Sequence, residues 1–395
     1  TTGAENTAIG YHSLLGNTTG AYNTSMGRSA SEDQTTGTFN ASFGYQSLEQ
    51  TTTASYNTGF GAYTLRTNTT GASNTAAGYQ ALYANTTGSG NTASGERALN
   101  TNTTASNNTA VGLDALRYNT TGTLNVAIGA NALDANTTGQ TNVAIGNIAL
   151  GANTTANNNT AVGYNSLAVN TTGHENTAVG TVSLDANTTG GLNTALGYGA
   201  LGANTTADNN TAVGYFALVT NTTGADNTAI GKDALKDATT ASYNTALGAL
   251  AAENTTTGHS NVAIGRASLN ENSTGDNNVA VGRNALLANS TADNNTAVGY
   301  SSLTANTTGT NGVAIGFQAS LSNTTGGQNT SLGWNAFGTN TTGSDNTALG
   351  KRALHASTTA SNNTAVGANS LLLNTTGLQN TAVGALSLDA NTTGS

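Results

Sequence analysis

The sequence predicts an all-β protein, a parallel β-solenoid (a β-roll or β-helix) with one coil per seventeen residues and about 23 coils. Three observations lead to this prediction. A Thr-Thr-Gly or Thr-Thr-Ala marker, twice with Ser in place of the first Thr, recurs at a constant spacing, so that its third residue falls at positions 3, 20, 37 and so on to 394. The apolar positions of the repeat fit no helical stripe. Asparagine and glycine recur at fixed positions, and repeats of constant length indicate units that stack in register.

The positions of the repeat differ in how much variation they accept. We take residues 187–203 as the representative unit and call each set of equivalent positions in successive repeats a column, named by its residue in this unit. The Thr189 column is threonine in all 24 copies, and the Gly197 column is glycine in all 23. The Asn193 column is asparagine in 22 of 23 copies, and the Leu201 column is leucine in 19. The predicted structural ladders are the columns of Thr189, Asn193, Ala195, Leu196, Gly197 and Leu201.

A repeat of this length is too short for a helix-turn-helix unit, so the predicted element is a β-strand within residues 193–196. Successive strand residues point to opposite sides, so Thr194 and Leu196 share one face and Ala195 has the other. Valine replaces Thr194 in five copies, which favours Thr194 and Leu196 as the inward pair. Glycine supplies the corners of the coil because it accepts backbone angles that other residues resist. Stacked Asn amides are expected to hydrogen-bond along the axis, as in cross-β assemblies.

The Ala195 column accepts only Ala, Ser or Gly. If it points outward, the close approach of another chain explains the restriction, so we expect self-association, with a homotrimer favoured. The period has no insertion, so residues 1–395 are expected to form a single solenoid domain. The chain opens and closes inside a repeat, so we expect it to be a segment of a longer one.

Composition excludes several classes of function. Charged residues make up only 7% of the chain, and the net charge is −9. The ten basic residues cannot build the phosphate-neutralising surface of a nucleic-acid-binding protein. No apolar run is long enough for membrane insertion. His12, His174, His259 and His355 occupy three different columns, so they predict no catalytic or metal centre. We expect no enzymatic activity, no metal and no cofactor.

The repeated core Asn-Val-Ala-Ile-Gly, at residues 125–129, 142–146 and 261–265, and its Asn-Thr-Ala-Val-Gly variants resemble the head repeats of trimeric autotransporter adhesins (YadA-like). Similar units occur in fibre proteins of phages and environmental bacteria. The resemblance implies a left-handed parallel β-roll, association of three chains and an extracellular adhesive rod. The repeat is longer than the usual unit of that family, and it adds the Asn-Thr-Thr-Gly turn.

Two sets of residues are candidate surface sites. Aromatic residues in the Tyr198 column suggest a stripe that binds carbohydrate or a partner, or else rings that stack on neighbours one coil away. The stripe consists of Tyr11, Tyr45, Tyr79, Tyr164, Tyr198, Tyr215, Tyr300, Phe317 and Trp334. Asn17, Asn68 and Asn187 match the N-glycosylation pattern, although Asn and Thr that close a corner by hydrogen bonds explain them equally.

The predicted function is a non-enzymatic extracellular or cell-surface structural fibre or adhesin shaft. It would be a rigid rod that associates with other copies of itself, laterally or end to end. Carbohydrate or a host surface would be its other partners. The alternatives are an ice-binding Thr-rich β-solenoid and a phage tail-fibre shaft. Ice-binding β-solenoids present flat, regular rows of Thr. The two adjacent marker threonines would point in opposite directions and Thr194 is expected to point inward, so a flat outward face with two Thr rows is not expected.

Overall fold

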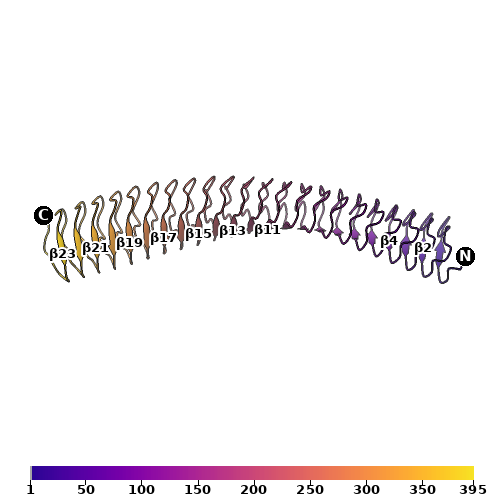
Figure 1. Ribbon diagram of the computed structural model, residues 1–395, viewed down its shortest axis with the longest axis horizontal. Helices are drawn as coiled ribbons and strands as arrows, with labels where there is room; N and C mark the ends of the chain where they lie inside the picture. Colours follow the sequence, from indigo (N-terminus) through magenta and orange to yellow (C-terminus); the bar gives the residue numbers. More distant parts are fainter. Residues whose placement is uncertain (1) are drawn as a thin grey trace. The chain divides into compact units, whose positions relative to one another are not determined.

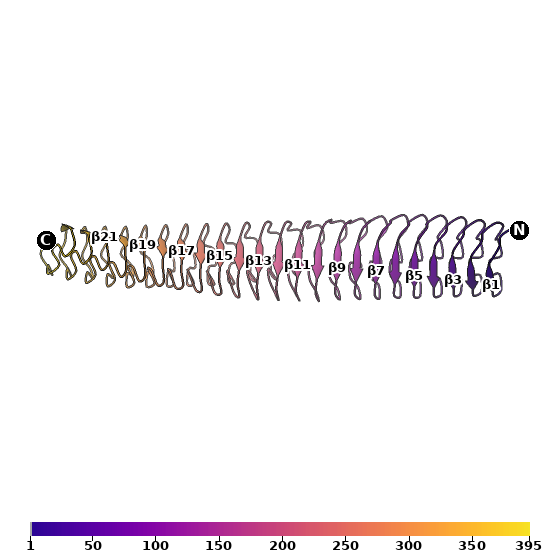
Figure 2. The same ribbon diagram turned by 90° about the horizontal axis from the view of Figure 1, so that it is seen from below.

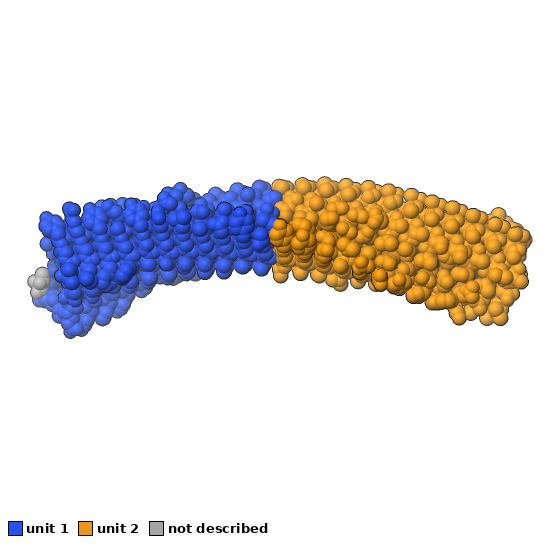
Figure 3. Space-filling model, turned by 180° about the vertical axis from the view of Figure 1, so that it is seen from behind, with its two compact units in different colours: residues 1–193 blue, residues 194–395 orange. Residues whose placement is uncertain are grey.

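The computed structural model describes residues 2–395. The chain divides into two compact units, Thr1–Asn193 (unit 1) and Thr194–Ser395 (unit 2), coloured blue and orange in Figure 3. Each unit is an all-β parallel solenoid with seventeen residues per coil, which confirms the predicted fold class. The expectation of one uninterrupted solenoid over residues 1–395 stays a prediction, as does the left-handed direction of the coil.

Each coil contributes one strand of three residues to the sheet of its unit. In unit 1 the strands are β1 (Thr7–Ile9), β2 (Thr24–Met26), β3 (Ala41–Phe43), β4 (Thr58–Phe60), β5 (Thr75–Ala77), β6 (Thr92–Ser94), β7 (Thr109–Val111), β8 (Val126–Ile128), β9 (Val143–Ile145), β10 (Thr160–Val162) and β11 (Thr177–Val179). In unit 2 they are β12 (Thr194–Leu196), β13 (Thr211–Val213), β14 (Thr228–Ile230), β15 (Thr245–Leu247), β16 (Val262–Ile264), β17 (Val279–Val281), β18 (Thr296–Val298), β19 (Val313–Ile315), β20 (Thr330–Leu332), β21 (Thr347–Leu349), β22 (Thr364–Val366) and β23 (Thr381–Val383). Within each unit the strands follow one another in chain order (Figures 1 and 2).

Backbone hydrogen bonds hold neighbouring coils in a constant register of one repeat, so that Thr211 pairs with Thr228 and Val213 with Ile230. The Thr211 amide donates to the Asn227 carbonyl at 2.8 Å. Each strand ends at the glycine column, where Gly316 has a φ of 133°. A Cβ on Gly316 would lie 2.6 Å from the Gly333 carbonyl oxygen, so the tight stacking of coils accounts for the glycine in every copy.

Three further positions in each coil place mostly non-glycine residues in the left-handed region, which the sequence did not predict; one is the column of Phe216, with a φ of 52°. Leu192 has a φ of 60°, and Leu201 has a φ of 52°. This conformation is unfavourable for a residue with a Cβ, and the surroundings must enforce it. Leu201 is fully buried, and its amide donates to the Ala217 carbonyl at 3.1 Å. Core packing therefore enforces the bend at the leucine column.

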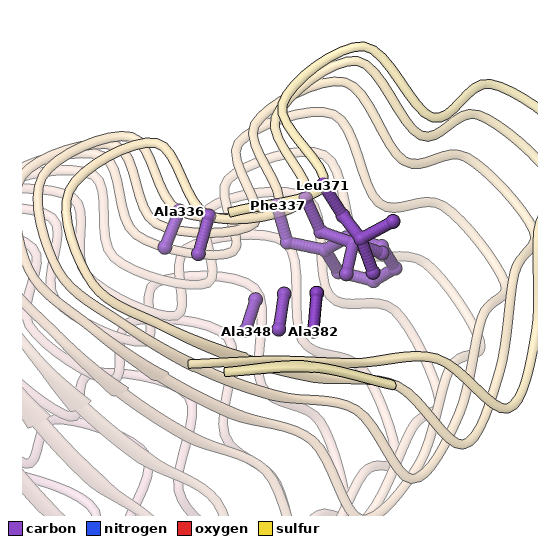
Figure 4. Packing of buried hydrophobic residues seen from close by; sticks show 8 residues of the cluster. Ala336, Phe337, Ala348, Leu371 and Ala382 are labelled. Atoms are coloured by element: carbon purple, nitrogen blue, oxygen red, sulfur yellow. The ribbon is translucent and has the colours of Figure 1, made fainter. Parts of the chain in front are cut away.

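The core corrects the predicted direction of the strand side chains. Ala195 points inward and is fully buried, whereas Leu196 points outward and is 37% exposed. Thr194 lies on the outward face with Leu196. In Figure 4, Ala348 and Ala382 point from the strand wall toward Phe337 and Leu371 on the opposite wall.

The opposite wall explains why only small residues occur in the Ala195 column. Gly59 occupies this column, and a Cβ there would contact Leu48 Cδ1 and lie 2.5 Å from Ser47 Oγ. Leucines of the Leu201 column therefore fill the interior, and a larger residue at Ala195 would clash with them. The restriction of the Ala195 column to small residues results from packing inside one chain. It is therefore no longer a reason to expect a trimer. Self-association itself stays a prediction.

Two columns of buried asparagine amides run beside the apolar core. In the Asn193 column, the backbone amide of Asn261 donates to Asn244 Oδ1 at 2.9 Å, and its Nδ2 donates to the Gly275 carbonyl at 2.8 Å. In the Asn187 column, Asn289 Nδ2 donates to Asn272 Oδ1 at 3.0 Å. The predicted ladder at Asn193 is present, and a second ladder at Asn187 accompanies it. Together they satisfy the buried polar groups at two corners of the coil.

Candidate functional site

The outward residues of the strands in unit 2 form a regular surface of two rows, which we call the outer strand face. Its first row is Thr194, Thr211, Thr228, Thr245, Val262, Val279, Thr296, Val313, Thr330, Thr347, Thr364 and Thr381. Its second row is Leu196, Val213, Ile230, Leu247, Ile264, Val281, Val298, Ile315, Leu332, Leu349, Val366 and Val383. The constant register sets the steps of this array. Neighbouring coils lie about 4.8 Å apart, and residues two apart along a strand are separated by about 6.6 Å.

No residue of the outer strand face carries a charge. The exposed columns beside the strand do accept charged residues, among them Asp226, Lys232, Arg266 and Asp345. A strand surface exposed to bulk water tolerates Lys and Glu, so their absence from both rows indicates a constraint on this surface. The strands alone explain a preference for β-branched residues but do not explain the exclusion of charge.

The corresponding surface of unit 1 is irregular in β2 to β6, whereas β7 to β11 carry Thr or Val in the first row and Val or Ile in the second. Met26, Phe43, Phe60, Ala77 and Ser94 occupy the second row in β2 to β6. Beside them, the exposed rings of Tyr22, Phe39 and Tyr56 form a stack with centroid distances of 4.8 and 5.3 Å. These coils therefore present side chains of unequal height.

Threonine hydroxyls divide into two groups. In the Thr188 column the hydroxyl usually donates to a backbone carbonyl one coil later, as Thr239 Oγ1 does to the Thr256 carbonyl at 3.1 Å. Within residues 2–395, the Thr189 column and the outward strand threonines make no side-chain hydrogen bond to protein. Thr189 and all its equivalents are exposed. Their hydroxyls are available to solvent or to a ligand.

The candidate glycosylation sites belong to the Asn187 column. Asn68 and Asn187 are fully buried, and the Nδ2 of Asn68 donates to the Gly71 carbonyl at 2.8 Å. Asn187 Nδ2 donates to Asn170 Oδ1 at 2.9 Å. A glycan on either nitrogen would displace these bonds and have no path to solvent, so both residues are structural in the folded coil. Asn17 lies near the N-terminal end of unit 1 and is half-buried, and its Nδ2 donates to the Gly20 carbonyl at 3.1 Å.

All nine residues of the predicted aromatic stripe are exposed. Several of them contact their own neighbours along the axis. Tyr198 stacks on Tyr215 at 5.6 Å, and Tyr300 stacks on Phe317 at 5.3 Å. Basic residues lie over some of the other rings, as Lys351 does over Trp334 at 5.4 Å and Arg28 over Tyr11 at 5.8 Å. The rings thus stabilise one another across coils, and a binding role for the stripe stays a prediction.

Titratable side chains are scattered over the coils. No group of three His, Asp or Glu residues able to hold a metal ion occurs among residues 2–395. One local cluster was not anticipated from the sequence: Arg66 Nε contacts Glu49 Oε2 at 2.6 Å and Nη1 donates to Tyr83 at 2.9 Å. These hydrogen bonds raise the pKa of Arg66. His355 is partly buried, and the loss of water around it lowers the pKa of its imidazole. Each contact lies between adjacent coils and stabilises their stacking.

Comparison with known proteins adds no assignment. No protein-family model matches the chain, and no curated protein sequence matches it. A helix long and apolar enough to cross a bilayer is not found in the described part of the chain. The fold and its repeated surfaces are therefore the evidence on function.

Proposed function

We propose that this protein is a non-enzymatic structural fibre or adhesin shaft, a rod that holds its surface side chains at fixed spacing. One observation carries the proposal. Within each unit, the backbone ladder continues in the same register from coil to coil, and the Asn193 ladder accompanies it in every coil but that of Gly312, while the Asn187 ladder runs in shorter stretches. Such a structure resists bending and sets a length, because each added coil repeats the same contacts with its neighbour.

The setting and partners of the rod are also proposals. The resemblance of the Asn-Val-Ala-Ile-Gly units to adhesin head repeats supports an extracellular or cell-surface location. Lateral or end-to-end self-association would turn single rods into fibres. Carbohydrate or a host surface would be contacted by the variable exposed columns, such as those of Leu192 and Tyr198, since these columns change freely without disturbing the core.

Electron cryomicroscopy of the purified chain tests the rod proposal. We expect elongated particles whose averaged images show an axial repeat of about 4.8 Å. Immunogold labelling of intact producing cells should place the protein on extracellular fibres or at the cell surface. Compact particles would contradict the rod, and labelling confined to the cell interior would contradict the location.

Ice binding is a second candidate function, and one observation favours it. One objection to it was the expected inward direction of Thr194, but the Thr194 column lies on the outward face, as a single threonine row beside the exposed aliphatic Leu196 column. Unit 2 thus presents a regular, uncharged row of threonines, nine in twelve coils. A freezing-hysteresis measurement on the purified chain tests this candidate directly, and a freezing point equal to the melting point at high protein concentration would reject it.

A further inference from the structure

We propose that the outer strand face of unit 2 is the surface that binds ice. The threonine row would supply hydroxyl groups, and the neighbouring aliphatic row would supply branched apolar side chains. This inference rests on the second candidate function and assigns it to one surface of the molecule.

A crystalline ligand needs a receptor that is itself periodic in two directions. The outer strand face meets this requirement, because every strand pair of unit 2 has the same register. Its steps of about 4.8 Å along the axis and about 6.6 Å along the strand recur in every coil. The backbone ladder holds these positions before binding, so little conformational entropy is lost when the ligand binds.

The chemistry of the two rows suits water in a lattice. A threonine hydroxyl donates one hydrogen bond and accepts others, as a water molecule does. The hydroxyls of this row, unlike that of Thr239, are not bound to the protein in the described coils. A charged side chain would hold its own strongly oriented water, and none occurs on this face. Apart from Val383 in the last strand, which is 71% exposed, the adjacent Val, Ile and Leu side chains are only partly exposed, as for Leu196 at 37%.

Other surfaces lack one or more of these properties. The Thr189 column is exposed and constant but forms a single row beside a column that contains Asp208, Asp276 and Asp293. The outward strand residues of unit 1 include Phe43 and Phe60, which interrupt an even surface, so its two regular rows extend only over β7 to β11, against all twelve strands of unit 2. A second copy of the chain would also cover the outer strand face, but it would have to pair or bury the free hydroxyls of the threonine row. That cost favours ice over a protein as the occupant.

The experiment compares two matched triple variants of residues 1–395. The first places rings above the threonine row: Thr245→Tyr, Thr296→Tyr and Thr347→Tyr. The second makes the same change five residues earlier in the Thr189 column: Thr240→Tyr, Thr291→Tyr and Thr342→Tyr. All six threonines are outward, and tyrosine is a good strand former. Circular dichroism and thermal unfolding verify that each variant folds. Freezing hysteresis and incorporation into a growing ice hemisphere are then measured.

We expect the first variant to lose most of the hysteresis and ice incorporation and the second to keep both. If the tyrosine variant does not fold, the triple variant Thr245→Lys, Thr296→Lys and Thr347→Lys replaces it, with the same expected loss. Equal activity of parent and first variant would overturn the site while leaving ice binding by another surface intact. Absence of activity in the parent would reject the second candidate function itself, whereas the rod proposal would stand. A parent that sediments as an oligomer, with a monomeric first variant, would assign the face to self-association instead.

Discussion

The hydroxyl of Ser320 donates to the hydroxyl of Ser331 across the core at 2.8 Å. Ser320 replaces leucine in the Leu201 column, and Ser331 replaces alanine in the facing Ala195 column. The same paired exchange occurs at Ser31 and Ser42, also at 2.8 Å. Both changes come together because a buried hydroxyl needs a partner. The two columns therefore face each other inside one coil stack, which is direct support for the inward direction of Ala195.

Ser331→Ala should destabilise the coils around it by about 1–3 kcal/mol, because the buried Ser320 hydroxyl loses its partner. Adding Ser320→Leu restores the common Leu–Ala pair and should recover that loss. Amide hydrogen exchange in β19 to β21 measures the local effect. If the double variant is less stable than the single one, the two columns are not coupled as described.

Gly59→Ala should destabilise unit 1, although alanine is the usual residue of its column. A Cβ there would lie 2.5 Å from Ser47 Oγ and 2.7 Å from Thr64 Oγ1. Thr64 is the only threonine in a column of Ala and Ser. Overpacking of this kind costs about 1–3 kcal/mol. Thr64→Ala in the same chain should relieve part of the clash, because it removes the Thr64 contact and restores the room into which Ser47 and Leu48 can shift, and thermal unfolding of the single and double variants checks it. If the double variant is no more stable than Gly59→Ala alone, Thr64 is not the cause of the destabilisation.

Thr255→Asn should stabilise unit 2. Thr255 lies in the Asn187 column, is fully buried, and its hydroxyl has no hydrogen-bond partner. An asparagine there could donate to the Gly258 carbonyl, as Asn272 Nδ2 does to Gly275 at 3.0 Å. Removing an unsatisfied buried hydroxyl is worth about 1–3 kcal/mol. Slower amide exchange in the adjacent coils is the expected readout, and faster exchange would contradict the ladder interpretation.

Asn261→Asp should destabilise unit 2 in a pH-dependent manner. The change removes the Nδ2 donors to Asn244 Oδ1 and the Gly275 carbonyl and buries a carboxyl group. Burial raises the pKa of that carboxyl in the folded state above its unfolded value. Stability is therefore greatest at acidic pH and is lost as the pH rises through the folded-state pKa. The matched control Asn277→Asp, in an exposed column that already contains Asp226 and Asp345, should show little change. Unfolding curves at several pH values test this, and equal profiles would contradict it.

Thr239→Val should cost about 0.5–1.5 kcal/mol, because the Thr239 hydroxyl donates to the Thr256 carbonyl. The adjacent Thr240→Val should change stability by no more than about 0.5 kcal/mol, because that side chain is exposed and donates to no protein group. Denaturant unfolding of the two variants separates these cases. A large loss of stability at Thr240 would show that threonine is constant in the Thr189 column because the fold requires it, and not because of a role at the surface.

Periodicity alone determined the length of the coil, the place of the strand, the glycine corner and the asparagine ladder at Asn193. Each follows from a constraint that repeats in every copy, such as the close approach of the Gly333 carbonyl to Gly316. The sequence also showed that Thr194 and Leu196 share one face, since strand side chains alternate.

Alternation does not say which face is inside. That choice depends on the opposite wall, where leucines of the Leu201 column, held in a left-handed conformation, occupy the interior and leave room only for small residues. The same wall-to-wall packing turns Thr194 and Leu196 outward, and with them the candidate binding surface. It also buries Asn187, which no local motif could reveal, because burial is set by residues that meet only when the coil closes.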